Sequence, residues 1–398
     1  MRIALLSYEY PEETGFGGIG TYTWFHARAL ARLGHEVHVL AGATSHGLLR
    51  PETHDGVRVW RTLNRTTSAV RLGLGLMRLW WTRERVRNAL DMWAAFRVLN
   101  RRHRFDVVEM PECGAEGVLV NRFADVPTIV RFHSPSRLIM PFHDVVERDR
   151  RWTSRIEDLA IAPATALSSS SRFLARELGK IGVNRNVEVI PNGIDLNWVD
   201  GVNDDGAPER LGIPAEKPVV LFAGRLERLK GIHLCPPIVA EILERHDCAF
   251  VFAGADRLGL AESELKPAMQ RRALRGTLHV LGHLAPSAVR ACVRRADVVF
   301  LPSLMESCPY SCLEAMAAGR AIVASDAGGI PELLQDDVNA RVVPTGDTTG
   351  FVDALDDLLR DARLRERLGA AARRAVETSL RDTDVARRAL ELYERAAR

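Results

Sequence analysis

Short apolar runs alternate with segments of helical spacing along most of the chain. The first run, Arg2–Ser7, is followed by a glycine-rich loop, Tyr8–Gly20, and then by Thr21–Leu33, whose apolar residues recur at helical intervals. A second apolar run, Glu36–Leu40, begins shortly after this segment. Strand, loop, helix and strand in this order predict the parallel βαβ unit with which a Rossmann-like domain begins.

The alternation repeats in two halves of the chain. Further apolar runs of the first half lie at 105–109, 128–132 and 187–190, and those of the second half lie at 218–223, 249–253, 278–281, 298–301 and 321–324. Residues 196–216 are polar and contain glycine and proline, so we place the domain boundary there. The pattern predicts an α/β protein with one domain at 1–195, a second at 196–380 and a terminal helix at 381–398.

Residues 58–104 depart from the simple alternation because they carry twelve arginines and only two acidic residues. Met77, Leu79, Trp80 and Trp81 lie among the arginines. We predict one or two helices here and favour a solvated surface on which arginine stems cover apolar neighbours. A surface that binds a substrate and a patch against anionic lipid are the alternatives.

Composition narrows the class of function. The chain has 398 residues, 46% of them hydrophobic and 26% charged, which is typical of a globular protein of two domains. The net charge of +3 argues against a nucleic-acid binder. The six cysteines show neither a Cys-x-x-Cys pair nor zinc spacing, so we expect reduced thiols. We find no signal peptide and no apolar run of membrane-spanning length, predict a cytoplasmic protein and disfavour membrane contact.

The stretch from Val298 to Leu334 holds the strongest candidate site. A strand at 298–301 leads into a loop with Glu306, and the predicted helix Tyr310–Ala318 carries Glu314 about one turn from its start. Ligands of open α/β sheets bind at the carboxyl ends of the strands, beside helix amino termini. Two carboxylates at this edge are suited to hold hydroxyl groups of a sugar or a ribose.

Two cations lie in the loop Gly224–Gly231, after the first strand of the second half. Arg225 and Lys230 suit a diphosphate, although each alone fits an ordinary surface charge equally well. The one Asp-x-Asp triplet, Asp382-Thr383-Asp384, lies between predicted helices, where a helix cap explains it better than a metal site. We therefore predict chemistry without a metal.

Two features of the first half remain open from the residues alone. His133 directly follows a buried strand, where active-site groups tend to lie, but a structural histidine bonded to the backbone fits as well. The glycines at 15, 17, 18 and 20 do not match the dinucleotide fingerprint G-x-G-x-x-G. An ordinary tight turn and a loop that approaches a phosphate or sugar are equally good interpretations of them.

Five motifs together resemble the retaining glycosyltransferases of family 4. They are GGIGTY at 17–22, HSP at 133–135, VIPNGID at 189–195, GRLERLKG at 224–231 and Glu-x7-Glu at 306 and 314. The resemblance covers nearly the whole chain and implies the GT-B fold, with two Rossmann-like domains facing each other across a cleft. It also implies that the last helix crosses back to brace the first domain.

The resemblance implies a role for each matching residue. Arg225 and Lys230 are expected to grip the donor diphosphate, and Glu314 is expected to hold the ribose. Glu306 and His133 are expected to contact the donor sugar, which makes His133, Arg225, Lys230 and Glu306 the candidate catalytic residues. Further donor-binding candidates are Gly17, Gly18, Gly224, Gly282, Tyr310, Ser311 and Cys312. On the acceptor side the candidates are Ser134 and, by a looser match, Arg155.

One departure from the family pattern bears on the sugar. Many relatives have an aromatic residue and a glycine between the two glutamates, where this chain has Cys308-Pro309. Proline has no amide to donate to a sugar hydroxyl. The identity of the sugar is therefore open.

The sequence predicts transfer of a hexose from a UDP- or GDP-sugar to a polar small molecule or glycan, with retention of configuration. We expect a same-face reaction without cofactor or metal, and closure of the domains over the donor. The alternatives are a nucleotide-sugar epimerase, a phosphorylase, a peripheral-membrane transferase with a lipid-linked acceptor and a non-catalytic binder of nucleotide sugars. Donor, acceptor and oligomeric state remain open.

Overall fold

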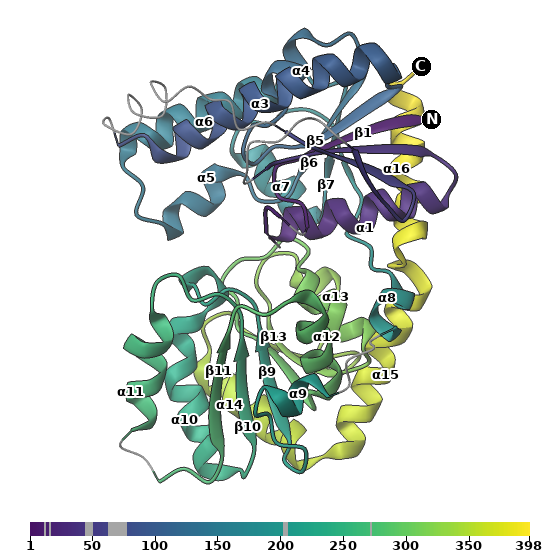
Figure 1. Cartoon of the computed structure of the whole chain (residues 1–398). Coiled ribbons are helices and arrows are strands. Elements are labelled where there is room, and N and C mark those ends of the chain that lie inside the picture. The colour runs from purple at the N-terminus through teal and green to yellow at the C-terminus, as the bar shows by residue number, and fades with distance from the viewer. Residues whose placement is uncertain (12, 16, 44–50, 63–77, 202–205, 271–272) are drawn as a thin grey trace. The chain divides into compact units, whose positions relative to one another are not determined.

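A computed structural model of the protein describes residues 1–398 except positions 12, 16, 44–50, 63–77, 202–205 and 271–272 (Figure 1). The chain divides into two compact units. Unit 1 comprises Met1–Gly193 and Asp382–Arg398, and unit 2 comprises Ile194–Arg381. These divisions lie within two residues of the limits expected from the sequence. Both units are α/β domains, as predicted.

Unit 1 is built on an eight-stranded sheet in the order β3-β4-β2-β1-β5-β6-β7-β8. All neighbours pair in parallel except β3 and β4. The strands are β1 (Arg2–Ser7), β2 (Glu36–Ala41), β3 (Pro51–His54), β4 (Val57–Arg61), β5 (Val107–Pro111), β6 (Thr128–Phe132), β7 (Ala166–Ser169) and β8 (Val187–Val189). Because β1 has β2 on one side and β5 on the other, the chain reverses its direction of travel across the sheet at β1 and β5, the usual place for a ligand.

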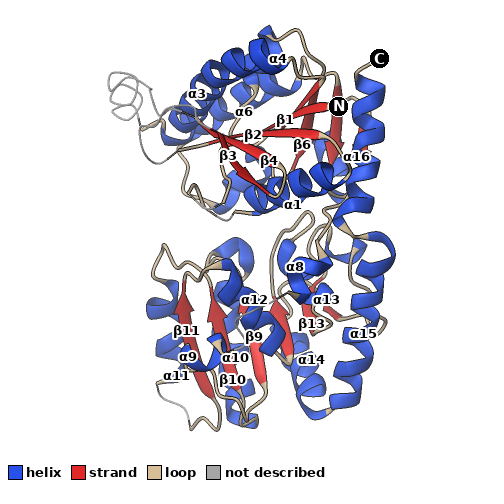
Figure 2. Cartoon of the chain, turned by 45° about the vertical axis from the view of Figure 1, so that its right-hand side comes forward, coloured by secondary structure: helices blue, strands red, loops and turns tan. Residues whose placement is uncertain are grey.

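Helices cover both faces of this sheet (Figures 1 and 2). On one face α1 (Gly18–Arg32) packs against α16 (Asp382–Ala396) over a shared apolar core. A second core holds the other face, which carries α3 (Trp80–His103), α4 (Val118–Phe123), α6 (Glu147–Ile161) and α7 (Arg172–Lys180). The short α5 (Ser136–Ile139) lies between β6 and α6 in the sequence. None of the described helices has the length and apolar content needed to span a membrane.

Buried hydrogen bonds hold the terminal helix α16 in unit 1. The hydroxyl of Tyr393 donates to a carboxylate oxygen of Glu109 on β5, at 2.7 Å. Burial lowers the pKa of His26 on α1 to about 3, so this ring is neutral and its Nε2–H donates to the same hydroxyl at 2.8 Å. Arg32 adds an ion pair with Asp382 at the start of the helix. The carboxyl-terminal residues are therefore part of the structure of the first domain.

Unit 2 has a six-stranded, entirely parallel sheet in the order β11-β10-β9-β12-β13-β14. The strands are β9 (Val219–Ala223), β10 (Ala249–Ala253), β11 (Thr277–Gly282), β12 (Val298–Leu301), β13 (Ala321–Ser325) and β14 (Arg341–Val343). The helices are α8 (Leu196–Asp200), α9 (Ala207–Arg210), α10 (Cys235–Arg245), α11 (Lys266–Met269), α12 (Pro286–Arg295), α13 (Tyr310–Ala317), α14 (Thr348–Arg360) and α15 (Ala362–Ser379). The strand order reverses between β9 and β12, so the loops that follow these two strands meet at one point of the edge.

The helix predicted within residues 58–104 occupies the later part of that segment, and a strand that was not predicted lies at its start. Residues 57–61 form β4, and β3 pairs with it in an antiparallel hairpin. The sequence VRVWR alternates in the strand period, with Val57 and Val59 buried and Arg58 exposed. From Trp80 the segment is one helix, α3, and the intervening 63–77 lie outside the described residues. The helix α1 also begins earlier than predicted, at Gly18 rather than Thr21.

Candidate functional site

The site in unit 2 is assembled where two loops meet at the carboxyl edge of the sheet. The loop after β9 ends in a 3₁₀ turn, Arg228–Lys230, and the loop after β12 begins at Pro302. A backbone hydrogen bond from the amide of Leu304 to the carbonyl of Leu229, 2.9 Å long, joins them. Gly231 has φ +76°, and a Cβ there would lie 1.9 Å from the carbonyl oxygen of Pro302. Glycine at this position is what allows the two loops to approach each other.

We expect Gly231→Ala to destabilise unit 2 by about 2 kcal/mol more than Gly259→Ala. Both glycines have positive φ, +76° and +68°, so both substitutions carry the cost of a left-handed alanine. Only the alanine at 231 meets a neighbour, because nothing lies within 4 Å of the Cβ position at 259. Urea unfolding of the two variants measures the difference. Equal loss in both would mean that the loops separate without cost.

Lys230 and Glu306 form the centre of this site. The ammonium Nζ of Lys230 lies 2.5 Å from Oε1 of Glu306, and the two side chains are 22% and 11% exposed. The hydroxyl of Ser303 donates to the same carboxylate oxygen at 2.9 Å. The amide of Gly329 donates to the backbone carbonyl of Glu306, which fixes the loop from the far side. The structure thus brings together one of the two predicted cations and one of the two predicted carboxylates.

Arg225 lies in the same loop but has a different partner. Its guanidinium is 3.1 Å from a carboxylate oxygen of Glu227, and its side chain is 56% exposed. The two predicted phosphate ligands are therefore unequal: Lys230 is held within the site, whereas Arg225 is on the surface of the loop.

The helix α13 directs its amino terminus at the same edge. Pro309 is its N-cap and has no side chain that accepts a hydrogen bond from the helix, and the first turn consists of Tyr310, Ser311 and Cys312. Backbone amides at an uncapped helix start, together with the helix dipole, attract anions. The proline at 309 thus leaves the helix amino terminus without a side-chain cap.

Glu314 projects from the second turn of α13 and is half-buried. Burial raises the pKa of its carboxyl group to about 7, and the nearby Arg290 on α12 opposes that shift. The guanidinium of Arg290 lies over the ring of Trp198, 4.0 Å from its centre, and donates to the carbonyl of Trp198. The carboxylate expected to hold the ribose thus has its charge tuned by a cation that Trp198 positions.

The predicted glycines 224 and 282 meet through a third one. The amide of Gly254 donates to the carbonyl of Gly282 at 2.8 Å, and the amide of Gly224 donates to the carbonyl of Ala253 at 2.9 Å. A Cβ on Gly254 would lie 1.8 Å from the carbonyl oxygen of Gly224. These glycines keep the ends of β9, β10 and β11 close together beside the Lys230 loop.

In unit 1, His133 lies at the carboxyl end of β6 and is buried. The carboxylate of Glu112, which follows β5, accepts hydrogen bonds from the amides of His133 at 3.0 Å and Ser134 at 2.7 Å. The hydroxyl of Ser134 donates to the carbonyl of His133. Burial, with help from the charge of Arg131, holds the pKa of His133 well below its usual range, so its ring is neutral.

The ring of His133 is fixed by Tyr22 on α1, with ring centres 4.9 Å apart. The hydroxyl of Tyr22 donates to Glu109 at 2.7 Å, and the guanidinium of Arg131 lies over the Tyr22 ring. Arg131 in turn donates to the side-chain oxygen of Asn192 at 3.0 Å. Asn192 belongs to the VIPNGID motif, so part of that motif supports the histidine from behind.

Gly17 makes room for a side chain. A Cβ on Gly17 would lie 1.8 Å from a carboxylate oxygen of Glu9, in the loop after β1. At Gly18 nothing lies within 4 Å of the corresponding position. Of the two glycines predicted to line the donor, Gly17 has to be a glycine because Glu9 occupies the space of a side chain there, whereas Gly18 borders open space.

Three glutamates of this edge were not predicted from the sequence. Glu9 follows β1, and Glu112 and Glu116 follow β5, the two strands at which the sheet order reverses. Burial raises the pKa of Glu112 to about 7 and that of Glu116 to about 8. The sequence does contain a signal for Glu112 and Glu116. The stretch PECGAEG directly follows an apolar run, and this places two acids where a ligand-binding edge is expected.

Glu116→Gln should stabilise the protein increasingly as the pH rises from about 5 to 8. The folded state holds the proton of Glu116 up to a pKa of about 8, whereas the unfolded chain releases it near 4.5. Wild-type stability therefore falls with rising pH across this interval, by roughly 1.4 kcal/mol per unit for this group. The glutamine can still accept from the amide of Tyr8. Urea unfolding at several pH values tests this, and a difference independent of pH would contradict it.

Arg155, the looser acceptor candidate, lies on the exposed side of α6. Its guanidinium is 5.5 Å from the centre of the Trp152 ring. Among the contacts of the described residues none joins Arg155 to Ser134, so the structure does not bring the two acceptor-side candidates together.

Among the described residues, one cluster of side chains could in principle hold a metal ion, but its hydrogen bonds do not suit one. This cluster, Glu36, His38 and His103, lies at the start of β2, on the edge opposite the candidate site. The indole of Trp60 donates to Nδ1 of His38 at 3.0 Å, so the proton of the neutral ring is on Nε2, where it faces Glu36. Arg58 adds a cation 2.5 Å from the same carboxylate. The group is a hydrogen-bonded network of the sheet.

The Asp-x-Asp triplet also has protein partners. Asp382 accepts from the amide of Thr383 and pairs with Arg32, and Asp384 pairs with Arg387. The start of a helix explains both acids, in keeping with the sequence interpretation.

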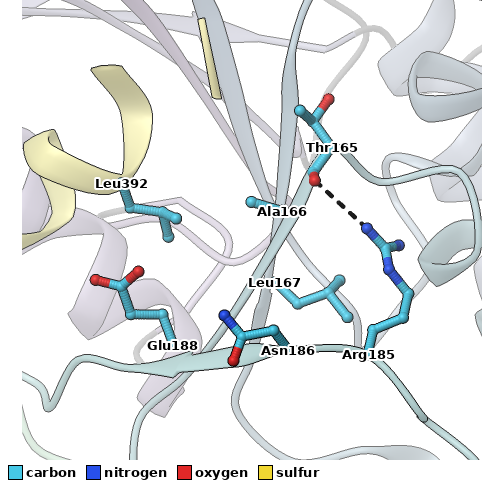
Figure 3. Close-up of a pocket in the computed structure, with 7 residues that line it drawn as sticks. All are labelled: Thr165, Ala166, Leu167, Arg185, Asn186, Glu188 and Leu392. Carbon is cyan, nitrogen blue, oxygen red and sulfur yellow. Dashed lines mark hydrogen bonds between the residues drawn. The ribbon is translucent and has the colours of Figure 1, made fainter. Parts of the chain in front are cut away.

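A cavity of about 300 Å³ in unit 1 lies at the amino ends of β7 and β8 (Figure 3). Arg185, its only cation, donates to the carbonyls of Ala164, Thr165 and the end of α6, and Glu188 pairs with Arg395. Its charged groups thus serve the structure, and the cavity is at the wrong edge of the sheet for the candidate site.

Comparisons with known proteins agree with this geometry. Residues 16–198 match the Glycosyltransferase Family 4 model, and residues 204–375 match the model of Glycosyl transferases group 1. A D-inositol 3-phosphate glycosyltransferase of Xylanimonas cellulosilytica is 30% identical over 94% of this chain and 92% of its own. Sucrose-phosphate synthase from Thermosynechococcus elongatus has a similar structure, with a TM-score of 0.80 at 20% identity over 99% and 98% of the two chains. Anabaena Alr3699/HepE in complex with UDP-glucose gives 0.72 at 19% identity, over 99% and 100%.

The two sheets, the order of their strands and the matches along both halves lead to one conclusion. The chain belongs to the family 4 glycosyltransferases and has their two-domain α/β GT-B fold.

Proposed function

We propose that this glycosyltransferase moves a hexose from a nucleoside diphosphate sugar to a hydroxyl of a polar small molecule or glycan, with retention of configuration and without a metal. The Lys230–Glu306 pair beside the uncapped start of α13 carries this proposal. It offers a cation for a phosphate, a carboxylate for sugar hydroxyls and helix amides for a further phosphate oxygen. Two structural neighbours support the donor class, since one was solved in complex with UDP-glucose and another with ADP and acarbose.

Donor binding would exchange partners within this pair. Lys230 and Glu306 neutralise each other at 2.5 Å, so neither charge has to be newly buried when the donor arrives. The diphosphate would take the ammonium of Lys230, and a sugar hydroxyl would donate to Glu306 in its place. Ser303 keeps Glu306 in position during the exchange. Lys230 and the α13 amides would then stabilise the negative charge that grows on the leaving diphosphate.

We propose a same-face reaction because Glu306 is a poor candidate for a nucleophile. A double displacement needs a carboxylate on the far side of the anomeric carbon. Glu306 is engaged by an ammonium and a hydroxyl, and Glu314 lies on a helix suited to the ribose. In the proposed step the acceptor oxygen bonds to the anomeric carbon as the bond to the diphosphate breaks, and the acceptor proton passes to a diphosphate oxygen.

The test combines a donor screen with product analysis. Thermal shifts with UDP-, GDP-, ADP- and TDP-hexoses identify the donor, because a ligand of the folded state raises the melting temperature. Transfer by the chelator-treated enzyme to a panel of polyols and glycans is then followed by NMR of the anomeric proton. The proposal predicts a retained anomer and unchanged turnover with chelator. An inverted product, a strict metal requirement, or isomerisation of the donor without an acceptor would each overturn a part of it.

A further inference from the structure

Exposed apolar side chains gather on one surface of unit 1. Of the nine large hydrophobic side chains that are exposed among the described residues, seven belong to α3, α4, α6 or the residue that precedes α6. They are Trp80, Leu90, Val98, Phe123, Val146, Trp152 and Leu159. Such a concentration of exposed apolar side chains is typical of an interaction surface.

The three helices form one layer. Each of α3, α4 and α6 packs against the other two, and they cover the face of the sheet opposite α1 and α16 (Figure 2). Their inner sides are buried in a common core or bonded to one another, as Arg85 of α3 is bonded to Glu157 of α6. We call the solvent-facing side of α3, α4 and α6 the outer helical layer.

On α6 the exposed side alternates apolar and cationic residues. Arg148, Trp152, Arg155 and Leu159 recur at intervals of four, three and four, which places them along one stripe of the helix. Trp152 is 45% exposed and Leu159 is 63% exposed. The arginines stand between them, and Arg155 contacts the face of the Trp152 ring.

A shallow depression of about 280 Å³ lies beside this stripe. Its lining consists of four arginines, one serine and one acid: Arg137, Arg150, Arg151, Arg155, Ser154 and Glu147. Arg137 is paired with Asp158, and Arg151 is paired with Glu147 at 3.2 Å, both members of that pair being largely exposed. Arg150 donates to the backbone carbonyl of Val145, and no ion pair of Arg150 is found among the residues that the structure describes. The depression therefore has an excess of positive charge and the size for phosphate groups.

The same combination recurs on the neighbouring helices. On α3, Arg83 lies over the Trp80 ring at 4.6 Å, and Arg97 lies over Trp93 at 5.7 Å. On α4, Arg122 lies over Phe123 at 5.5 Å. Aromatic rings flanked by arginine are suited to a boundary between an apolar and an anionic environment.

We propose that the outer helical layer docks on the surface of an anionic lipid bilayer. Trp152, Leu159 and their apolar neighbours would enter the boundary of headgroups and acyl chains, while the arginines bind lipid phosphates. Charge favours this partner over a second copy of the chain, because a symmetric contact would bring the arginines of one copy against those of the other. The proposal goes beyond sugar transfer and holds whichever donor and acceptor the enzyme uses.

The experiment is co-sedimentation of the full chain with vesicles of phosphatidylcholine alone or with about 30% phosphatidylglycerol. Binding is expected only with the anionic vesicles, and it should weaken as salt is added. Arg148→Gln with Arg151→Gln should weaken binding on the order of tenfold or more. Trp152→Ser with Leu159→Ser should weaken it by a similar factor, because apolar contact is lost.

A matched double variant in unit 2, Leu258→Ser with Arg363→Gln, changes equally exposed side chains and should bind vesicles like the wild type. Equal binding to both vesicle types, or no binding to either, would overturn the proposal. It would also be overturned if inorganic phosphate released the protein more effectively than chloride of equal ionic strength, since the depression would then be a site for free phosphate. Light scattering that shows a dimer abolished by Leu159→Ser would assign the layer to contacts between copies instead.

Discussion

Lys230→Ala is expected to lower kcat/KM by about a hundredfold or more while the protein stays folded. In the proposed reaction its ammonium is the closest cation to the diphosphate, and the growing charge of the leaving group depends on it. The substitution also leaves Glu306 without its ion pair, so the carboxylate loses a partner at 2.5 Å. Initial rates over a range of donor concentrations, with urea unfolding in parallel, give both quantities.

Arg228→Ala is the matched control for this experiment. Arg228 occupies the same 3₁₀ turn, but its side chain is 58% exposed and paired with Glu264. Its loss should change kcat/KM by no more than about twofold, because exposed ion pairs contribute little. Normal turnover of Lys230→Ala, or an equal loss in both variants, would show that the phosphate site has been placed wrongly. Arg225→Ala, at a 56% exposed position, then tells whether this second cation joins the diphosphate.

The positions of the unit 2 candidate residues could be predicted from the sequence because each lies in a short local motif. A buried run such as Val298–Leu301 favours a central strand, and a helix with a glutamate about one turn from its start follows after the loop 302–309. The rule that loops meet at the carboxyl edge then places Lys230 near Glu306. What the sequence could not show was the asymmetry of the two cations. The partner of Arg225, Glu227, is only two residues away, and its contact depends on the loop conformation.

The unit 1 site was only half predicted because its support is not local. His133 was found from its position after a strand, but Glu112, Tyr22 and Asn192 come from three other parts of the chain. Their contacts follow from the strand order β1-β5-β6, which the sequence does not state. The β3–β4 hairpin was missed for a different reason. The strand Val57–Arg61 has a two-residue period, but it overlaps the arginine-rich segment 58–104, whose composition favoured helices.

Binding of the donor should weaken as the pH falls, because of Glu314. Its carboxyl group has a pKa raised to about 7 by burial, so it is mostly neutral at pH 6 and mostly charged at pH 8. A charged carboxylate accepts hydrogen bonds from ribose hydroxyls more strongly than a neutral acid does. If the charged form alone binds, the dissociation constant rises about tenfold for each pH unit below about 7. Protonation thus opposes binding.

Direct titration calorimetry with the nucleotide sugar is the appropriate measurement. Rates are less suitable, since Glu112 and Glu116 in unit 1 have pKa values raised to about 7 and 8 and titrate in the same interval. Glu314→Gln should bind the donor weakly and almost equally at pH 6 and 8, whereas Glu116→Gln should keep the wild-type slope. A slope that survives in Glu314→Gln would move the pH dependence to another group and remove the ribose role from Glu314. Arg290→Gln should shift the midpoint of the binding curve to higher pH. The charge of Arg290 opposes the raised pKa of Glu314, so its removal lets burial raise that pKa further. Such a shift would show that Arg290 acts on the carboxylate that holds the donor.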